Sequence, residues 1–166
     1  SGVTEVETYA GGFVGILGGE TRAENSYASG LVDSNGVTGG FTAVNEGTIE
    51  HCFSTMTIGE NGVVRGAFIA EGDGNLSACA YDRQIACVRE HENQESESTV
   101  KGLNTTELIG TQSQMPGLWF TVENAYPQIE YFAQSVQETV SSCSKASVIA
   151  LMLPKGVTLL DIVYGS

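Results

Sequence analysis

The chain has 166 residues, enough to bury a core, and it carries 7 Lys and Arg against 20 Asp and Glu. The resulting formal net charge of −13 opposes binding to nucleic acid and to anionic membrane surfaces. With 21 glycines, 3 prolines and 16% charged residues, the composition favours an all-β fold of short strands and tight turns over a helical or disordered chain.

The N-terminal half of the chain repeats one sequence pattern three times. Phe13, Phe41 and Phe68 are spaced by 28 and 27 residues, and a period of this length is typical of a solenoid in which each repeat forms one coil. We therefore predict a short parallel β-solenoid of three coils from about Ala10 to Ile85. Stacking of the coils would place these phenylalanines in one column with a spacing of about 4.8 Å.

A second set of matching positions in the three copies supports the same alignment. Tyr27, Phe53 and Ala80 are spaced by 26 and 27 residues, and the positions before them are Ser26, Cys52 and Cys79. Each copy reads as strand, turn, strand and turn, because Gly and Asn supply the positive φ that the corners need.

The second copy predicts which side chains point inward. Strand alternation places Ile49 and Phe53 together on the inner face and Glu50 on the outer face. His51 would then also point inward, unless a bulge intervenes. The first copy carries two more residues than the second, in "LGGETRAENS", and an insertion of this kind is expected at a corner.

The segment after the repeats predicts a cap for the solenoid. The acidic run "REHENQESEST" indicates a solvated loop. After it, Asn104 or Thr105 can cap a short helix that continues to Gly110. Strands are expected at 118–122 and 128–132, which would form a terminal hairpin.

Two domains are expected, namely residues 1–132 as the solenoid with its cap and residues 133–166 as a linker and the start of a truncated β module. The second would contain strands near 146–153 and 158–164. Its most apolar run, "ASVIALML", is far shorter than the roughly 20 residues that span a bilayer, so no membrane insertion is expected.

Four cysteines are present, at positions 52, 79, 87 and 143, without the spacing of a zinc finger. A bridge between Cys79 and Cys87 would fix "AYDRQIA" as a turn at the end of the last coil. The alternatives are a strained Cys52–Cys79 bridge between stacked coils and buried free thiols that pack as small apolar side chains.

These motifs resemble the GLUG-repeat family of bacterial surface proteins. The resemblance rests on "GGFVG…ENSYASG" and "GGFTAVNEGTIEHCFST", followed by "SACAYDRQ", "NTTELIG" and "LWFTVENAYPQIEYF", and it covers roughly residues 9–132. Ala67 and Ala70 depart from the family's glycines, and His51 stands where asparagine is common. The resemblance implies a large exported protein of the cell wall or an adhesin, in which such repeats are spacers or binding surfaces. In some immunoglobulin-A-cleaving metallopeptidases they accompany a catalytic domain.

The motif search gives little support for catalysis. A zinc peptidase needs HExxH, but His91-Glu92 is followed by Glu95 in place of the second histidine, and His51 is the other histidine of the chain. The sequence contains no nucleophile elbow, P-loop or dinucleotide fingerprint. We therefore expect a protein that is not an enzyme and needs no cofactor.

One acidic corner is a candidate for weak Ca²⁺ binding. Glu46 and Asp73 align on neighbouring coils, and Glu71 lies beside Asp73 in "EGDGN". Such carboxylates in an acidic chain also serve solubility alone. In the closing segment Trp119, Tyr126, Tyr131 and Phe132 could form an aromatic platform for a glycan only where they are exposed, and at alternating strand spacing most of them are expected to face the core.

The expected function is that of a non-catalytic extracellular repeat module of a bacterial surface protein. It would act as a structural spacer or as an adhesion surface, with a host glycan, a host protein or neighbouring domains of its own chain as partner. The alternatives are a polysaccharide-active β-helix enzyme, with Glu46, Glu71 and Asp73 around a cation, and an accessory domain of a secreted peptidase.

Overall fold

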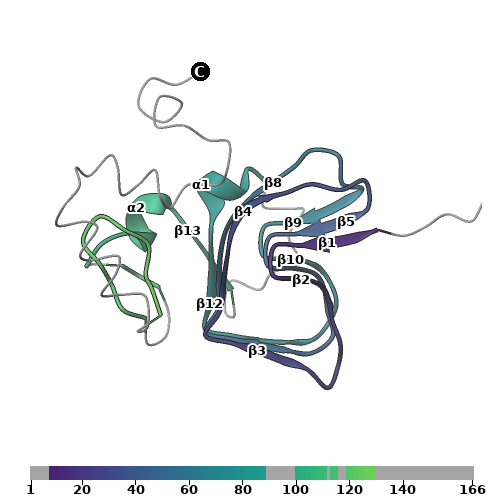
Figure 1. Cartoon of the computed structure of the whole chain (residues 1–166), viewed down its shortest axis with the longest axis horizontal. Helices are drawn as coiled ribbons and strands as arrows, with labels where there is room; N and C mark the ends of the chain where they lie inside the picture. The colour runs from purple at the N-terminus through teal and green to yellow at the C-terminus, as the bar shows by residue number, and fades with distance from the viewer. Residues whose placement is uncertain (1–7, 89–99, 112, 116–118, 130–166) are drawn as a thin grey trace, which may run out of the picture.

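The computed structural model describes residues 8–88, 100–111, 113–115 and 119–129. Its first twelve strands wind into three parallel coils of four strands each, which confirms the predicted all-β solenoid (Figure 1). The first coil consists of β1 (Tyr9–Gly11), β2 (Val14–Leu17), β3 (Arg22–Glu24) and β4 (Tyr27–Val32). The second consists of β5 (Val37–Gly39), β6 (Thr42–Asn45), β7 (Thr48–Glu50) and β8 (Phe53–Ile58). The third consists of β9 (Val64–Gly66), β10 (Ile69–Glu71), β11 (Asn75–Ser77) and β12 (Cys79–Asp82).

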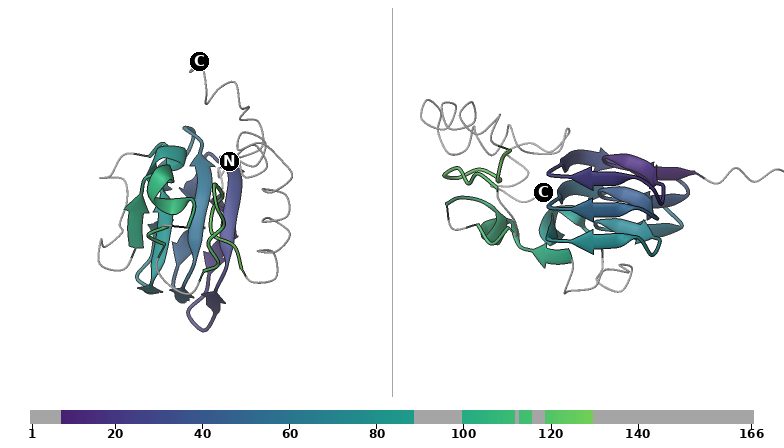
Figure 2. Two further views of the ribbon diagram at one scale, coloured as in Figure 1. Left: turned by 90° about the vertical axis from the view of Figure 1, so that its left-hand side faces the viewer. Right: turned by 90° about the horizontal axis from the view of Figure 1, so that it is seen from below.

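Equivalent strands of successive coils pair in parallel and form four sheets, ordered β1-β5-β9, β2-β6-β10, β3-β7-β11 and β4-β8-β12-β13. The stacking of the coils is visible in the right-hand view of Figure 2. The strand register confirms the predicted insertion. Leu17 pairs with Asn45 and Arg22 pairs with Thr48, so the first coil has two more residues between these pairs than the second. The first coil therefore carries its two extra residues at the corner between β2 and β3. There the Thr21 amide donates to the carbonyl of Gly18 at 2.9 Å and closes a turn.

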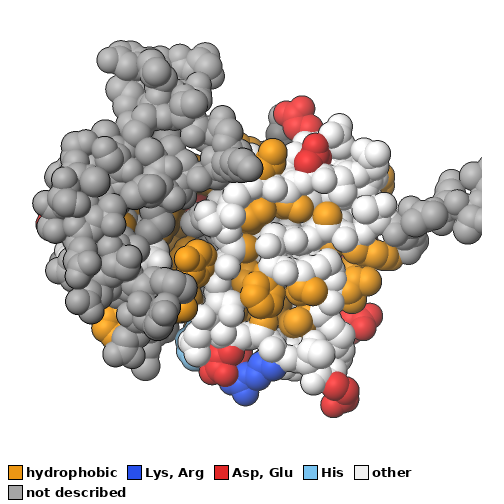
Figure 3. Space-filling model, in the orientation of Figure 1, with side chains coloured by type: hydrophobic (Ala, Val, Ile, Leu, Met, Phe, Trp, Pro, Cys, Tyr) orange, Lys and Arg blue, Asp and Glu red, His pale blue; other side chains and the backbone are white. Residues whose placement is uncertain are grey.

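The phenylalanine column lies along the inside of the stack. Phe41 stacks on Phe13 at a ring-centroid distance of 4.8 Å and on Phe68 at 5.1 Å, as the repeat spacing predicts. Phe41 and Phe68 are fully buried, whereas Phe13 is 49% exposed. Phe13 belongs to the first coil, whose end faces the viewer in Figure 3 with a central group of apolar side chains. Among the described residues no strand pairs with the free edge of this coil.

A glycine column forms the tight corner before each phenylalanine. Gly11, Gly39 and Gly66 occupy equivalent register positions on the three coils. A Cβ atom at any of them would overlap a backbone carbonyl oxygen, that of Val14, Thr42 or Ile69, respectively. This steric requirement explains why each copy of the repeat keeps a glycine two residues before its phenylalanine.

A left-handed corner separates the third strand of each coil from the fourth. Asn25, His51 and Ala78 all have a positive φ, of 49°, 52° and 51°. The corner changes the alternation of side chains, so Ile49 points into the interior while Phe53 points out of it, into a second cluster. The prediction that Ile49 and Phe53 share the inner face is therefore wrong, although both are buried.

The second cluster covers the outer face of the β4-β8-β12-β13 sheet. Its buried members are Phe53, Ala80, Leu103, Leu108, Met115 and Tyr126. The covering residues come from α2 (Thr105–Leu108) and the segment that follows it. The column that contains Tyr27 and Phe53 is stacked as predicted, at a centroid distance of 5.2 Å, but it lies in this outer cluster.

The cap contains one strand that the sequence did not predict. β13 (Val100–Leu103) adds a fourth parallel strand to the β12 edge of that sheet. Helix α1 (Arg83–Ala86) replaces the turn expected after β12, with Asp82 as its N-cap. Helix α2 begins after Asn104, which is one of the two predicted caps and forms a capping box with Glu107, but the helix ends at Leu108 before the expected Gly110.

Other predictions about the C-terminal part are tested in part or not at all. Where two strands of a hairpin were expected, the described residues have a single antiparallel bridge between Phe120 and Gln128. The proposed second module, residues 133–166, lies outside the described residues, as do Tyr131 and Phe132. No helix in the described ranges is long and apolar enough to cross a membrane.

Candidate functional site

The left-handed corner of the first two coils gathers charged side chains on the outside of the solenoid. Glu24 ends β3 and Glu50 ends β7, and they are direct register partners in the parallel sheet. Their carboxylates therefore project from adjacent coils on the same face. In the third coil the equivalent position is Ser77, so the pair of carboxylates is confined to the first two coils.

Arg22 is shared between these two carboxylates. Its guanidinium donates a hydrogen bond to Glu50 Oε2, and its Nη2 lies 3.4 Å from Glu24 Oε1. The Arg22 side chain is 54% exposed and that of Glu24 is 44% exposed, so solvent screens the interaction and the pair contributes little stability. One positive charge thus faces two negative charges at this corner.

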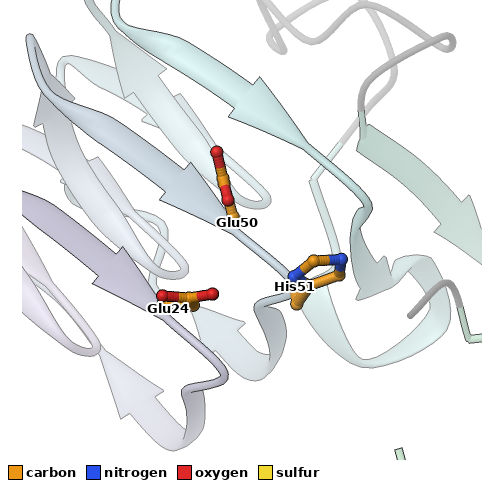
Figure 4. A group of neighbouring side chains, drawn as sticks. All are labelled: Glu24, Glu50 and His51. Atoms are coloured by element: carbon orange, nitrogen blue, oxygen red, sulfur yellow. The ribbon is translucent and has the colours of Figure 1, made fainter. Parts of the chain in front are cut away.

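His51 completes the group at the same corner. One potential ligand atom from each of Glu24, Glu50 and His51 lies within 4.8 Å of the others, and Figure 4 shows the three side chains on neighbouring strand ends. The His51 backbone has a left-handed conformation. Its amide donates a hydrogen bond to the Ser77 carbonyl at 3.0 Å. We call Glu24, Glu50 and His51 the corner triad.

The acidic residues predicted to bind Ca²⁺ do not form such a group. Among the described residues the corner triad alone has three ligand atoms so close together, which leaves out Glu46, Glu71 and Asp73. Glu71 is half-buried in β10, in register with Val44, whereas Glu46 and Asp73 lie on exposed corners.

The cysteines of the described residues are free thiols. Cys79 is buried, and its thiol points to the carbonyls of Ser77 and Ile49, at 3.2 and 3.6 Å. Cys87 is exposed at the end of α1, where it donates to the Gln84 carbonyl. The predicted Cys79–Cys87 bridge is absent, with Cys79 buried in β12 and Cys87 exposed after α1, and the Cys52–Cys79 alternative is absent as well. Cys52 packs in the interior, as the free-thiol alternative expected.

The thiols in the interior are hard to ionise. Burial raises the pKa of Cys52 from 9.0 to about 12 and that of Cys79 from 9.0 to about 11. Because the thiolate is the reactive form, neither group suits nucleophilic catalysis or metal binding near neutral pH.

The aromatic residues of the cap pack against the solenoid. Trp119 contacts Phe53 and Tyr27 edge-on, at centroid distances of 4.8 and 6.5 Å. The hydroxyl of Tyr126 donates to Asp82 Oδ2 at 2.7 Å. Both residues therefore face a core, as the sequence predicts.

Asp82 joins the last coil to the cap. Its carboxylate is fully buried and accepts from the backbone amides of Gln84 and Ile85 and from the hydroxyls of Thr105 and Tyr126. Burial, followed by the charge of Asp82, raises the pKa of the Tyr126 phenol. The donors come from α1, α2 and the closing segment, so this group holds the cap in place and is not accessible to a substrate.

The sequence did not lead to a prediction of the corner triad, although the alignment of the repeats places its residues in matching positions. Ser26, Cys52 and Cys79 align, so the two preceding columns pair Glu24 with Glu50 and Asn25 with His51. The sequence prediction paired carboxylates across neighbouring coils at Glu46 and Asp73 and related His51 to an incomplete HExxH motif, so the column that contains Glu24 and Glu50 was not considered.

Comparison of the chain with protein-family models, with curated proteins and with solved structures finds no match.

Proposed function

We propose that the chain is a non-catalytic extracellular repeat module of a bacterial cell-surface protein, acting as a structural spacer or as an adhesion surface. The observation that carries the proposal is the stacked interior, in which Phe41 lies between Phe13 and Phe68 in contact with both rings. Side chains fill the inside of the coils, so the module offers length and outer faces for contact.

The charge and the family resemblance support the same role. A net charge of −13 keeps an exposed module soluble and disfavours contact with nucleic acid. The resemblance to GLUG repeats supports export and a place in the cell wall. The partner we propose is a host glycan, a host protein or a neighbouring domain of the same protein.

Binding and turnover assays test this proposal. The chain is screened on a glycan array and incubated with acidic polysaccharides while reducing ends are measured. Binding without turnover supports an adhesion surface, and the lack of both supports a spacer. Metal-dependent cleavage that Asp73→Asn abolishes would overturn the proposal in favour of a polysaccharide-active enzyme.

A further inference from the structure

We propose that the corner triad of Glu24, Glu50 and His51 is a binding site for a divalent transition-metal ion, with Zn²⁺ as the ion that the ligands suit best. The site would join the first coil to the second on the outer face of the solenoid. This inference is independent of the proposed function, since a spacer, an adhesin or an enzyme could carry such a site.

The chemistry of the ligands selects the class of ion. Two carboxylates and one imidazole form a mixed oxygen and nitrogen set, which Zn²⁺ accepts in three-ligand sites that leave a position for water. An imidazole ligand favours Zn²⁺ and its neighbours in the first transition series over Ca²⁺ and Mg²⁺, which prefer oxygen ligands alone. The triad therefore differs in kind from the all-carboxylate calcium site expected at Glu46, Glu71 and Asp73.

The charges at the corner also favour a cation. Glu24 and Glu50 are register partners on adjacent coils, and Arg22 is the basic residue paired with both. After that pairing, the corner retains one uncompensated negative charge. A divalent ion would offset this charge, and the partial exposure of the triad leaves it accessible from solvent.

The positions of the ligands are set by the fold. Glu24 and Glu50 come from paired strands, and His51 follows Glu50 at the left-handed corner. Their ligand atoms already lie within 4.8 Å of one another, so modest side-chain rotations bring them into one coordination sphere. Arg22 donates to Oε2 of Glu50 and lies 3.4 Å from Oε1 of Glu24, so it competes with the ion for one oxygen of each carboxylate.

The test measures Zn²⁺ binding by titration calorimetry on the full chain, in a background with Cys87→Ser and Cys143→Ser to remove thiol ligands. His51→Asn removes the imidazole while keeping the corner, because Asn25 holds the same conformation in the first coil. We expect His51→Asn and Glu24→Gln each to weaken Zn²⁺ binding at least about tenfold. Arg22→Gln should tighten it by roughly threefold or more, since a competing charge is removed.

Matched controls separate the site from general binding to an acidic surface. Glu46→Gln removes an exposed carboxylate outside the triad, and His91→Asn removes the other histidine of the chain. Both should keep the parent affinity, with circular dichroism confirming that every variant is folded. In the parent, Co²⁺ should give visible d–d absorption that His51→Asn abolishes. The proposal fails if His51→Asn keeps the parent affinity, if Glu46→Gln weakens binding as much as Glu24→Gln, or if Arg22→Gln reduces it.

Discussion

Gly39 illustrates how a single residue type is required by the packing of the coils. A Cβ atom at this position would overlap the backbone carbonyl of Thr42, so the chain at the corner would have to move. Backbone atoms cannot rotate away as a side chain does, and the second coil is packed on both sides. We therefore expect Gly39→Ala to reduce the free energy of unfolding by about 3 kcal/mol or more, measured by urea denaturation.

Gly18 provides the control for that substitution. A Cβ atom at Gly18 would have no other atom within 4 Å, so Gly18→Ala should change the free energy of unfolding by no more than about 0.5 kcal/mol. Equal losses for the two variants would contradict the steric explanation.

Cys52 and Cys79 make stability depend on pH in the alkaline range. Burial raises their pKa values from 9.0 to about 12 and about 11, so the folded state holds the thiol protons more tightly than the unfolded state. Their contribution is complete below about pH 9 and is lost as pH rises through the folded values. Each thiol then lowers the free energy of unfolding by up to about 1.4 kcal/mol per pH unit.

The measurement compares the parent with the double variant Cys52→Ala/Cys79→Ala by urea denaturation at several pH values between 8 and about 11. We expect the loss of stability above pH 9 to be shallower in the double variant. Parallel curves for the two proteins would show that these thiols titrate alike in the folded and unfolded states.

At the level of elements, the sequence predicts the three coils but misses the added strand β13 and the direction of the side chains after the left-handed corner. The spacing of Phe13, Phe41 and Phe68 was sufficient to predict the coils and their register, because each coil repeats the same contacts. β13 was missed because it adds a strand to one sheet without a complete repeat around it. The outward position of Phe53 was missed because His51, unlike Gly or Asn, does not signal a left-handed corner in the sequence.

The cap depends on the buried carboxylate of Asp82. Because α1, α2 and the closing segment all donate hydrogen bonds to it, its removal leaves several buried donors without an acceptor. We expect Asp82→Ala to lower the free energy of unfolding by about 3 kcal/mol or more, and Tyr126→Phe, which removes one donor, to lower it by about 1.5 kcal/mol.

Trp119 reports on the cap directly, since it is the single tryptophan of the chain and packs edge-on against Phe53. In Asp82→Ala its fluorescence should shift to longer wavelength at urea concentrations where circular dichroism still reports folded coils. Simultaneous loss of both signals would show that cap and coils unfold as one unit.

For the whole molecule, the excess of negative charge affects the stability of the folded coils. The chain has seven basic and twenty acidic residues. The ion pairs of Arg22 with Glu24 and Glu50 are partly exposed. Repulsion among the acidic side chains acts over the whole surface, whereas these pairs are local and weak. The net effect of the charges should therefore oppose folding.

Salt should then stabilise the protein. Raising NaCl from about 10 mM to about 150 mM shortens the screening length from about 30 Å to about 8 Å, which weakens long-range repulsion more than contacts between neighbouring charges. We expect the free energy of unfolding to rise by roughly 1 kcal/mol, equivalent to about 2–4 °C in Tm, measured by calorimetry at neutral pH without divalent ions. A fall in Tm over the same range would mean that ion pairs, and not repulsion, dominate the electrostatics of the folded chain. The Arg22→Gln variant, which lacks the shared cation, should gain at least as much from salt as the parent.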